Sequence, residues 1–266
     1  MPGLMTLLRF LLKPPVLALV GITWILSNRR RRRVAALSIA GTVIGAVVLG
    51  ELLLDHRHLP WRGLDVNDRA GLSTGLRLRA LGLGPDGWCA EKLNTADALT
   101  LKPMDAWYGD KEGSESCGWP GAYHIESSAG RTLTGSSVYP MRCALTAGAL
   151  IWINSADYHA RRILGSELVR VHHAGTYSCR RMYGRSRGKM SQHAYANAWD
   201  VTGFELADGR IVSVLKDWSA GGDAQRFLRV VHRDACRTFN VVLGPDYNAA
   251  HRDHFHVDMG NGVICR

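Results

Sequence analysis

The stretch that decides the fold reads His251-Arg-Asp-His-Phe-His-Val-Asp258 and lies near the end of the 266-residue chain. Side chains of a β-strand point alternately to its two faces. A strand over 254–259 therefore places His254, His256 and Asp258 on one face. The two apolar residues between them point to the other face, toward a hydrophobic core. The sequence thus predicts a closing strand that carries polar, metal-ligating side chains on one side only.

Three histidines within six positions are unusual for a purely structural strand, and they indicate a metal site. Asp253 lies just before the strand and three residues from His256, within reach of a metal-bound water if the chain bends there. His251 either stands in the site or lies on the preceding loop, and the sequence leaves both alternatives open. Asp258 is a candidate for orienting one of the imidazole rings from outside the metal sphere.

A second polar cluster lies upstream and reads Ser191-Gln-His-Ala-Tyr-Ala-Asn-Ala-Trp-Asp200. Metal-dependent hydrolysis needs about three imidazole or carboxylate ligands, an open position for water and a nearby base. The two clusters together supply these groups, and Asn197 is a further candidate for orienting a ring. Histidines outside the clusters, such as His172, His173 and His232, are interpreted as ordinary surface or core residues.

The pattern around the clusters predicts an α+β fold, in which a small mixed or antiparallel sheet has helices packed to one side. Asp-Gly at 208–209 favours a hairpin turn, and Asp223 is a candidate helix cap. No internal repeat is present. The expected elements are helices over 143–152, 156–168 and 223–239, strands over 169–177, 199–206, 210–215 and 254–259, and a loop over 180–189.

The segments ahead of residue 143 carry weaker signals. Residues 55–85 contain Pro, Trp, Gly and Arg and are interpreted as a tether. Residues 88–136 are rich in Gly, Ser, Asp and Pro, which indicates loops and short strands. The sequence therefore predicts a membrane segment over 1–54, a tether over 55–85 and a domain over 86–266 with its catalytic core over 169–266.

The N-terminal part contains an uncharged apolar run over 34–50, which Leu52 to Leu54 extend to about 20 residues, enough to cross a bilayer as a helix. Arg29 to Arg33 precede it. Cationic flanks stay in the cytoplasm, so we expect a span over 34–54 that places everything after Asp55 across the membrane. A buried core helix and a cleaved signal peptide are the alternatives. Residues 1–28 are either a first span, an interfacial helix or a long leader.

The distribution of charge and cysteine agrees with export. Seven of the 33 basic residues but only one of the 23 acidic residues precede residue 55, so the remaining 212 residues carry 26 basic and 22 acidic side chains, a net charge of +4. A body so nearly neutral argues against nucleic-acid binding. All six cysteines follow the predicted span and none forms a Cys-x-x-Cys pair. Up to three disulfides are expected, with the pairing left open.

The two clusters resemble the LAS metallopeptidases, which include vancomycin-resistance D,D-dipeptidases, D,D-carboxypeptidases and penicillin-insensitive murein endopeptidases. Their pattern is Ser-x-His-x6-Asp, followed by an acid or histidine just ahead of the last ligand, often as His-x-His. Ser191, His193 and Asp200 match the first part, and His254 and His256 match the second. The resemblance implies a Zn²⁺ site whose ligands are His193, Asp200 and His256.

A closer likeness is to the bacterial extensin-like C-terminal family, and it covers roughly 89–266. That family implies a bacterial peptidase-like fold rather than a plant wall glycoprotein. The stretches that carry the likeness are Tyr-Ser-Cys-Arg at 177–180, Ser-Gln-His-Ala at 191–194, Ala-Asn-Ala-Trp-Asp at 196–200, Ala-Asp-Gly at 207–209, and the block 243–259.

These resemblances imply hydrolysis of an amide bond in peptidoglycan stem peptides or cross-links. Asp253 holds the place of the catalytic carboxylate, although it is shorter than the glutamate of the dipeptidases. His254 then binds the oxyanion or supports the base. Arg180 stabilises negative charge, with Arg181 as its rival, and Ser191 holds a substrate carboxylate.

Two other functions remain compatible with the sequence. The first is a non-catalytic module that binds or organises the cell wall and keeps the zinc site for stability or recognition. The second is a closed structural metal site, which needs a fourth protein ligand such as His251. Whichever of these three functions the protein has, the sequence predicts a protein anchored in the cytoplasmic membrane with its main domain in the periplasm or outside the cell.

Overall fold

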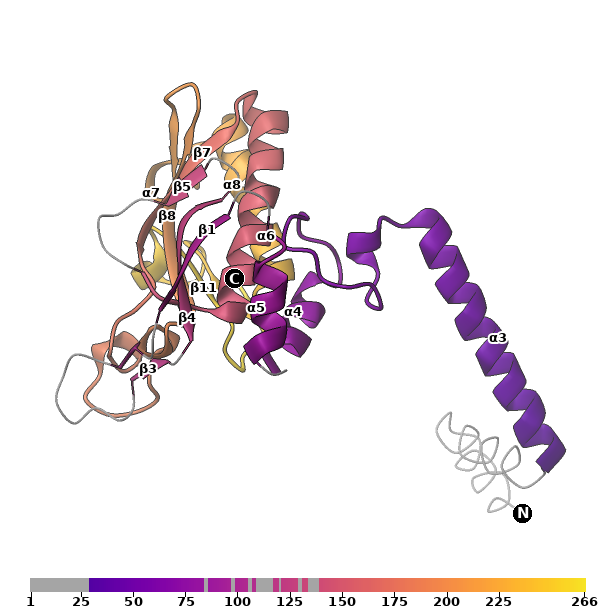
Figure 1. Ribbon diagram of the computed structural model, residues 1–266. Helices are drawn as coiled ribbons and strands as arrows, with labels where there is room; N and C mark the ends of the chain where they lie inside the picture. Colours follow the sequence, from indigo (N-terminus) through magenta and orange to yellow (C-terminus); the bar gives the residue numbers. More distant parts are fainter. Residues whose placement is uncertain are drawn as a thin grey trace, which may run out of the picture. The chain divides into compact units, whose positions relative to one another are not determined.

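The computed structural model describes residues 29–83, 86–96, 99–104, 107–108, 117–119, 121–128, 131–133 and 139–266. The chain divides into two compact units, Met1–Asp55 and His56–Arg266 (Figure 1). The alternatives considered for residues 1–28 lie outside the described residues.

The described part of the N-terminal unit is one helix, α3 (Arg29–Leu53). It is long and apolar enough to cross a membrane, and this length and composition are those of a membrane anchor or of a signal sequence. None of its residues is buried, which disfavours the core-helix alternative. Arg29 to Arg33 are helical together with the apolar run, because arginine is a good helix former and the basic run therefore continues the same helix.

Residues 56–83 are part of the folded unit, and the prediction of a tether over 55–85 is wrong there. They form η1 (His56–His58) and α4 (Thr74–Leu83). Leu59 and Leu78 are buried, and the Ala70 backbone N–H donates to Ser155 on α6 at 2.7 Å. The buried apolar residues of this segment follow no regular period, so the sequence contained no signal of their packing.

The folded unit is built on a ten-stranded sheet among the described residues, larger than the small sheet that the sequence predicted. Its order is β1-β4-β5-β7-β8-β11-β10-β12, with β6 beside β4 and β9 beside β8. The pairs β5–β7 and β10–β12 are parallel and the others antiparallel. The strands are β1 (Leu99–Met104), β4 (Ala122–Ser128), β5 (Arg131–Leu133), β6 (Met141–Arg142), β7 (Leu168–Gly175), β8 (Ala198–Leu206), β9 (Ile211–Ser213), β10 (Val241–Leu243), β11 (Phe255–Asp258) and β12 (Ile264–Cys265). β2 (Trp107–Tyr108) and β3 (Gly118–Trp119) form a separate pair.

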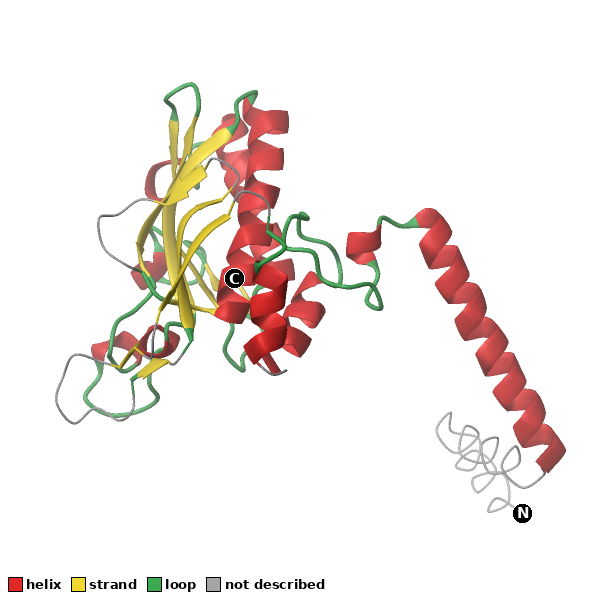
Figure 2. Ribbon diagram, viewed as in Figure 1, coloured by secondary structure: helices red, strands yellow, loops and turns green. Residues whose placement is uncertain are grey.

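The longer helices of the folded unit lie together on one side of the sheet (Figure 2). They are α4, α5 (Asp86–Leu93), α6 (Cys143–His159) and α8 (Gly222–Thr238). The π-turn η2 (Ala160–Leu164) extends α6, and the one-turn helix α7 (Val214–Asp217) follows β9. The arrangement confirms a mixed α/β fold. The predicted hairpin is confirmed as β8 and β9, although Val214 and Leu215 begin α7 instead of ending the strand.

Two predicted helix boundaries differ from the structure. The helices expected over 143–152 and 156–168 are one continuous helix, because the Ser155 hydroxyl donates back to the Ile151 carbonyl and interrupts nothing. Asp223 does not cap α8. The cap position is Gly221, which has a φ of 83° and offers no side chain, and Asp223 lies in the first turn, where its charge favours the positive helix end.

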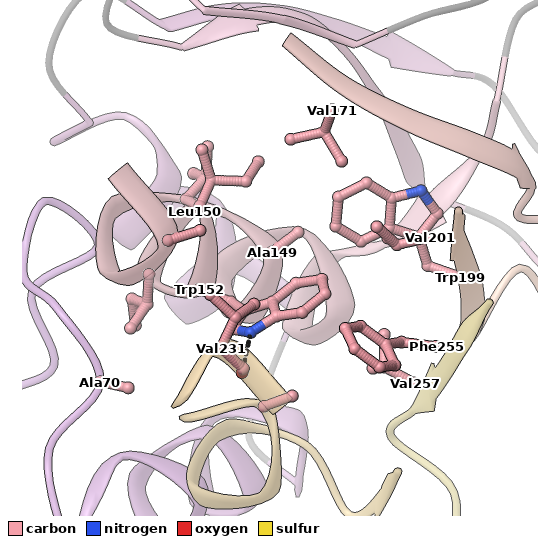
Figure 3. Close-up of a cluster of buried hydrophobic side chains, with 14 of the residues drawn as sticks. Ala70, Ala149, Leu150, Trp152, Val171, Trp199, Val201, Val231, Phe255 and Val257 are labelled. Atoms are coloured by element: carbon pink, nitrogen blue, oxygen red, sulfur yellow. Dashed lines mark hydrogen bonds between the residues drawn. The ribbon is translucent and has the colours of Figure 1, made fainter. Parts of the chain in front are cut away.

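The core lies between the helices and the sheet, and Trp152 of α6 is at its centre. Its indole contacts Trp199, Phe204 and Phe239 edge to face, with ring centroids 5.7, 6.0 and 5.7 Å away. Its Nε1–H donates to the Val231 carbonyl at 2.9 Å, which joins α6 to α8 (Figure 3). The apolar side chains of the central strands therefore face the helices. The polar side chains that alternate with them point to the other side of the sheet.

Three disulfides close the folded unit, as the sequence predicted in number, and pair Cys89–Cys143, Cys117–Cys179 and Cys236–Cys265. The last joins α8 to the C-terminal strand β12. We expect the double variant Cys236→Ser/Cys265→Ser to lower the free energy of unfolding by about 2–4 kcal/mol, because the unfolded chain gains freedom. Urea denaturation without reductant measures this. A loss below about 0.5 kcal/mol would show that β12 is held by its other contacts.

Candidate metal centre

Strands β8 and β11 bring two predicted ligands side by side. They pair antiparallel with His256 directly opposite Asp200, so both side chains leave the sheet on the same face. Their strand neighbours Trp199, Phe255 and Val257 are fully buried in the core. The alternation predicted for the closing strand is thus confirmed, and His256 Nδ1 lies 2.9 Å from Asp200 Oδ1.

His193 reaches the same point from a short 3-10 helix, η4 (Gln192–Tyr195). Ser191 caps that helix, because its hydroxyl accepts a hydrogen bond from the His193 backbone N–H at 3.3 Å. At the other end Ala196 takes a left-handed φ of 51°, which turns the chain into β8. His193 is only 4% exposed, so both local contacts and burial fix its ring.

The three side chains form a triangle of donor atoms. His193 Nε2 lies 3.2 Å from Asp200 Oδ2 and 3.2 Å from His256 Nδ1. A tetrahedral zinc ion with bonds of about 2.0–2.1 Å places its donors about 3.3–3.4 Å apart. The observed spacing is therefore close to that of three zinc ligands. Across the described ranges one other group of potential ligands comes as close, namely His232 with Cys236 and Cys265, but those sulfurs form a disulfide.

Each imidazole is held so that the nitrogen in the triangle is the one available to a metal. His193 Nδ1–H donates to the Thr176 carbonyl at 3.2 Å, which leaves Nε2 as the ligand atom. His256 Nε2–H donates to Asp258 Oδ2 at 3.0 Å, which leaves Nδ1. Asp258 is itself fixed, since its Oδ1 accepts from the Gly260 N–H at 2.7 Å. Carbonyl and carboxylate partners of this kind support metal-bound histidines in many sites.

The charges in the triangle depend on one another. Burial raises the pKa of Asp200, but hydrogen bonds and positive charge from His193 and His256 outweigh it and lower that pKa well below its usual range. Burial lowers the pKa of His256, but hydrogen bonds to Asp200 and Asp258 outweigh it and raise that pKa to about 9. Two buried carboxylates therefore require a positive charge among them, which either a proton or a metal cation supplies.

The support from Asp258 leads to a prediction. Asp258→Asn is expected to weaken zinc binding about 10- to 100-fold, because the amide is a poorer acceptor for the His256 Nε2–H and lowers the basicity of Nδ1. Competition with a zinc-selective chelator measures the affinity. Asp223→Asn, an exposed substitution of the same type on α8, serves as the control and should leave the affinity unchanged. Equal affinities in the two variants would remove Asp258 from this role.

His254 and Asp253 lie beside the triangle in an order that differs from the expected one. The Asp253 carboxylate is half exposed and accepts from His254 Nδ1–H at 2.8 Å, and this hydrogen bond lowers its pKa. His254 Nε2 lies 3.6 Å from Asp200 Oδ1. The imidazole therefore stands between Asp253 and the ligand triangle, although the sequence suggested that Asp253 would face the metal-bound water itself.

His251 forms a wall of the site. Its ring centroid lies 5.3 Å from that of His254 and 5.8 Å from that of His256, and its Nδ1–H donates to Asn248 Oδ1 at 2.7 Å. Burial, with the nearby His256 and His254, lowers its pKa to about 4, so the ring is neutral. It does not belong to the group of converging ligand atoms, and a closed site with His251 as fourth ligand is therefore not favoured.

For the predicted substrate-contacting residues Arg180, Arg181 and Ser191, the structure gives only local contacts. The Arg180 side chain is exposed, while its carbonyl accepts from the Ser191 N–H at 3.0 Å. The Arg181 guanidinium donates to the Gly188 carbonyl. Ser191 is buried and caps η4 as described above. The proposed substrate contacts of Arg180 and Ser191 thus stay predictions.

Some contributors to the site carried no signal in the sequence. The Thr176 carbonyl and the Gly260 N–H are backbone groups, so their residue types say nothing about their roles. Asn197, a candidate for orienting a ring, instead donates to the Gln192 side chain at 2.7 Å and stabilises the turn that carries His193. Of the two residues that the sequence suggested for orienting a ring, Asp258 is the one that hydrogen-bonds a candidate ligand, His256.

Comparison with known proteins adds one finding. The family described as Extensin-like protein C-terminus matches residues 88–266, which include all three residues of the triangle together with Asp253 and His254. No curated protein and no solved structure gives a match.

Proposed function

The chain belongs to the extensin-like C-terminal family, and from this premise we propose that it is a zinc-dependent hydrolase of amide bonds in peptidoglycan peptides, of the D,D-carboxypeptidase or endopeptidase type. The observation that carries the proposal is the largely buried triangle of His193, Asp200 and His256. Its two imidazoles are oriented by outer partners, and its donors lie 2.9 to 3.2 Å apart, slightly closer together than in a tetrahedral zinc site. Three protein ligands leave a fourth position open, as catalytic zinc sites do.

His193 Nε2, Asp200 and His256 Nδ1 would hold Zn²⁺, and the residues present fit this ion in donor type and in hydrogen-bond support. Bound there, zinc supplies a Lewis acid that polarises the scissile carbonyl and lowers the pKa of its water to about 7.

His254 is the residue placed to move the proton. Its Nε2 lies on the triangle side, and its Nδ1–H is held by Asp253. In this proposal Nε2 accepts a proton from the water that attacks the carbonyl carbon, and Asp253 stabilises the imidazolium that results. The same proton then passes to the leaving amine nitrogen as the C–N bond breaks. Asp253 thus acts through His254 and is a positioning residue.

The substrate class rests on the resemblance to the LAS peptidases and on the predicted location. Arg180 is proposed to stabilise negative charge on the reacting carbonyl, and Ser191 to hold a substrate carboxylate. We propose that α3 anchors the chain in the cytoplasmic membrane, with Arg29–Arg33 inside. The folded unit with its three disulfides would then lie in the periplasm or outside the cell.

Product analysis tests the proposal. The full chain, purified in detergent under oxidising conditions, is incubated with intact peptidoglycan and with enzymatically released muropeptides, with and without a chelator, and products are identified by mass. Loss of D-alanine that zinc restores after chelation indicates a carboxypeptidase, and cleavage of cross-linked dimers indicates an endopeptidase. Binding to the wall without new products would reject the enzyme and favour a non-catalytic wall-binding module.

A further inference from the structure

Helix α4 leaves an apolar face uncovered in the described structure. Leu76, Ala80 and Leu83 recur at the i, i+4, i+7 spacing that normally marks the buried face of a helix. Here all three are exposed, Leu76 by 62% and Leu83 by 89%, and Leu72, in the turn that leads into the helix, is 66% exposed. The opposite side of α4 packs into the core through Leu78. The helix is therefore apolar on two sides, of which the folded unit covers one.

A contiguous exposed apolar stripe is unusual on a soluble domain and marks an interaction surface. We call the face formed by Leu72, Leu76, Ala80 and Leu83 the α4 outer face. Trp61 precedes it on the same segment and is 47% exposed. Tryptophan is enriched where proteins meet the membrane–water interface, because its ring is apolar and its N–H is polar.

The place of this segment along the chain restricts what can cover it. Only Leu54 and Asp55 separate the end of α3 from His56, where the folded unit begins. Two residues span at most about 7 Å, and the headgroup layer on each side of a bilayer is about 5–8 Å thick. If α3 crosses the membrane, the chain must enter the folded unit within or directly above the headgroups.

The charge of the segment fits the same partner. Residues 56–83 contain five arginines and two aspartates. Arg77 is buried and donates to the Gly63 and Arg57 carbonyls, so four arginines are left to face a partner, whereas the body of the chain is nearly neutral. Arginines close to a membrane are attracted to anionic lipid headgroups, and their long stems can lie along apolar surface. An apolar stripe, an interfacial tryptophan and a local excess of arginine together have the composition of a membrane-surface element.

We propose that residues 56–83 dock on the anionic lipid surface of the membrane that α3 enters, with the α4 outer face and Trp61 in the interfacial layer. The inference rests on the proposed membrane anchor and not on the proposed hydrolysis. Docking would hold the folded unit close to the bilayer surface.

Spin labelling of the full chain tests the docking. All six cysteines are paired in disulfides, so a single introduced cysteine can carry a nitroxide. Leu76→Cys reports on the α4 outer face, and Ile211→Cys on β9 is the matched control, because Ile211 is an apolar side chain with 57% exposure. Both chains are placed in nanodiscs of phosphatidylethanolamine and phosphatidylglycerol, and collision of the label with oxygen and with a water-soluble nickel complex is measured.

At position 76 we expect a ratio of oxygen to nickel collision several-fold higher than at position 211, and a lower ratio in nanodiscs of phosphatidylcholine alone. Equal ratios at the two positions would overturn the docking, and an unchanged ratio in the neutral lipid would overturn its dependence on anionic headgroups. Spin–spin broadening at position 76 that disappears on dilution with unlabelled chain would show that a second copy covers the face, which also rejects the proposal. The measurement does not involve peptide hydrolysis. A result that rejects the docking would therefore say nothing against the proposed activity.

Discussion

His193→Ala is expected to weaken zinc binding by at least about 100-fold and to abolish zinc-dependent hydrolysis. Loss of an outer partner alone costs about 10- to 100-fold in affinity, and His193 supplies one of three donors directly. Its removal also leaves Asp200 and His256 with a space where the third donor stood. Metal content after dialysis against a zinc buffer, measured by mass spectrometry, gives the affinity.

The control for this variant is His172→Ala. His172 is a part-buried histidine on β7 that pairs with Glu205 at 3.0 Å, outside the triangle, so its loss changes histidine content and local packing without touching a donor. Circular dichroism on both variants checks that the fold persists. If His193→Ala binds zinc as tightly as the control, the ion is held elsewhere and the site described here is not a metal centre.

His254→Ala is expected to lower kcat by about 10²- to 10⁴-fold while zinc stays bound, because it removes the group that moves the proton but none of the three ligands. Asp253→Asn should also lower kcat with zinc retained, since the amide cannot stabilise the imidazolium in the same way. Asp253 accepts a hydrogen bond from Nδ1 of His254, so we expect the two residues to act as one unit in the proposed reaction.

The relative size of the losses in kcat shows whether His254 or Asp253 is the base. If His254 moves the proton, the double variant loses no more than His254→Ala alone, because residues that act together are not additive. If Asp253 is the base and His254 only a support, Asp253→Asn has the larger effect. Full activity in both variants would remove the pair from the mechanism altogether.

The sequence was sufficient where one strong local pattern decided the structure. Alternation over 254–259 predicted that His256 and Asp258 share a face opposite to Phe255, and the structure confirms it. Asp-Gly at 208–209 predicted the β8–β9 turn correctly, because few residues tolerate its backbone. Residue types alone indicated only that the two clusters could supply metal ligands, and the resemblance to the LAS peptidases implied the set His193, Asp200 and His256. The structure brings these three side chains together.

The sequence was insufficient where structure depends on distant contacts. Residues 56–83 pack on α6 without any period of their own, as the bond from Ala70 to Ser155 illustrates. The composition of residues 88–136 indicated loops and short strands, but it did not indicate that β1, β4 and β5 would join the main sheet. The order of Asp253 and His254 depends on how the chain bends before β11, which residue spacing alone does not specify.

The central claim is that His193, Asp200 and His256 share one zinc ion. X-ray absorption at the zinc edge of the loaded full chain tests it most directly. We predict one zinc per chain, surrounded by nitrogen and oxygen at about 2.0–2.2 Å, with scattering from two imidazole rings and none from sulfur. In His256→Ala one imidazole contribution should be lost or the ion should not bind. A sulfur shell at about 2.3 Å, or a spectrum that His256→Ala leaves unchanged, would contradict the account.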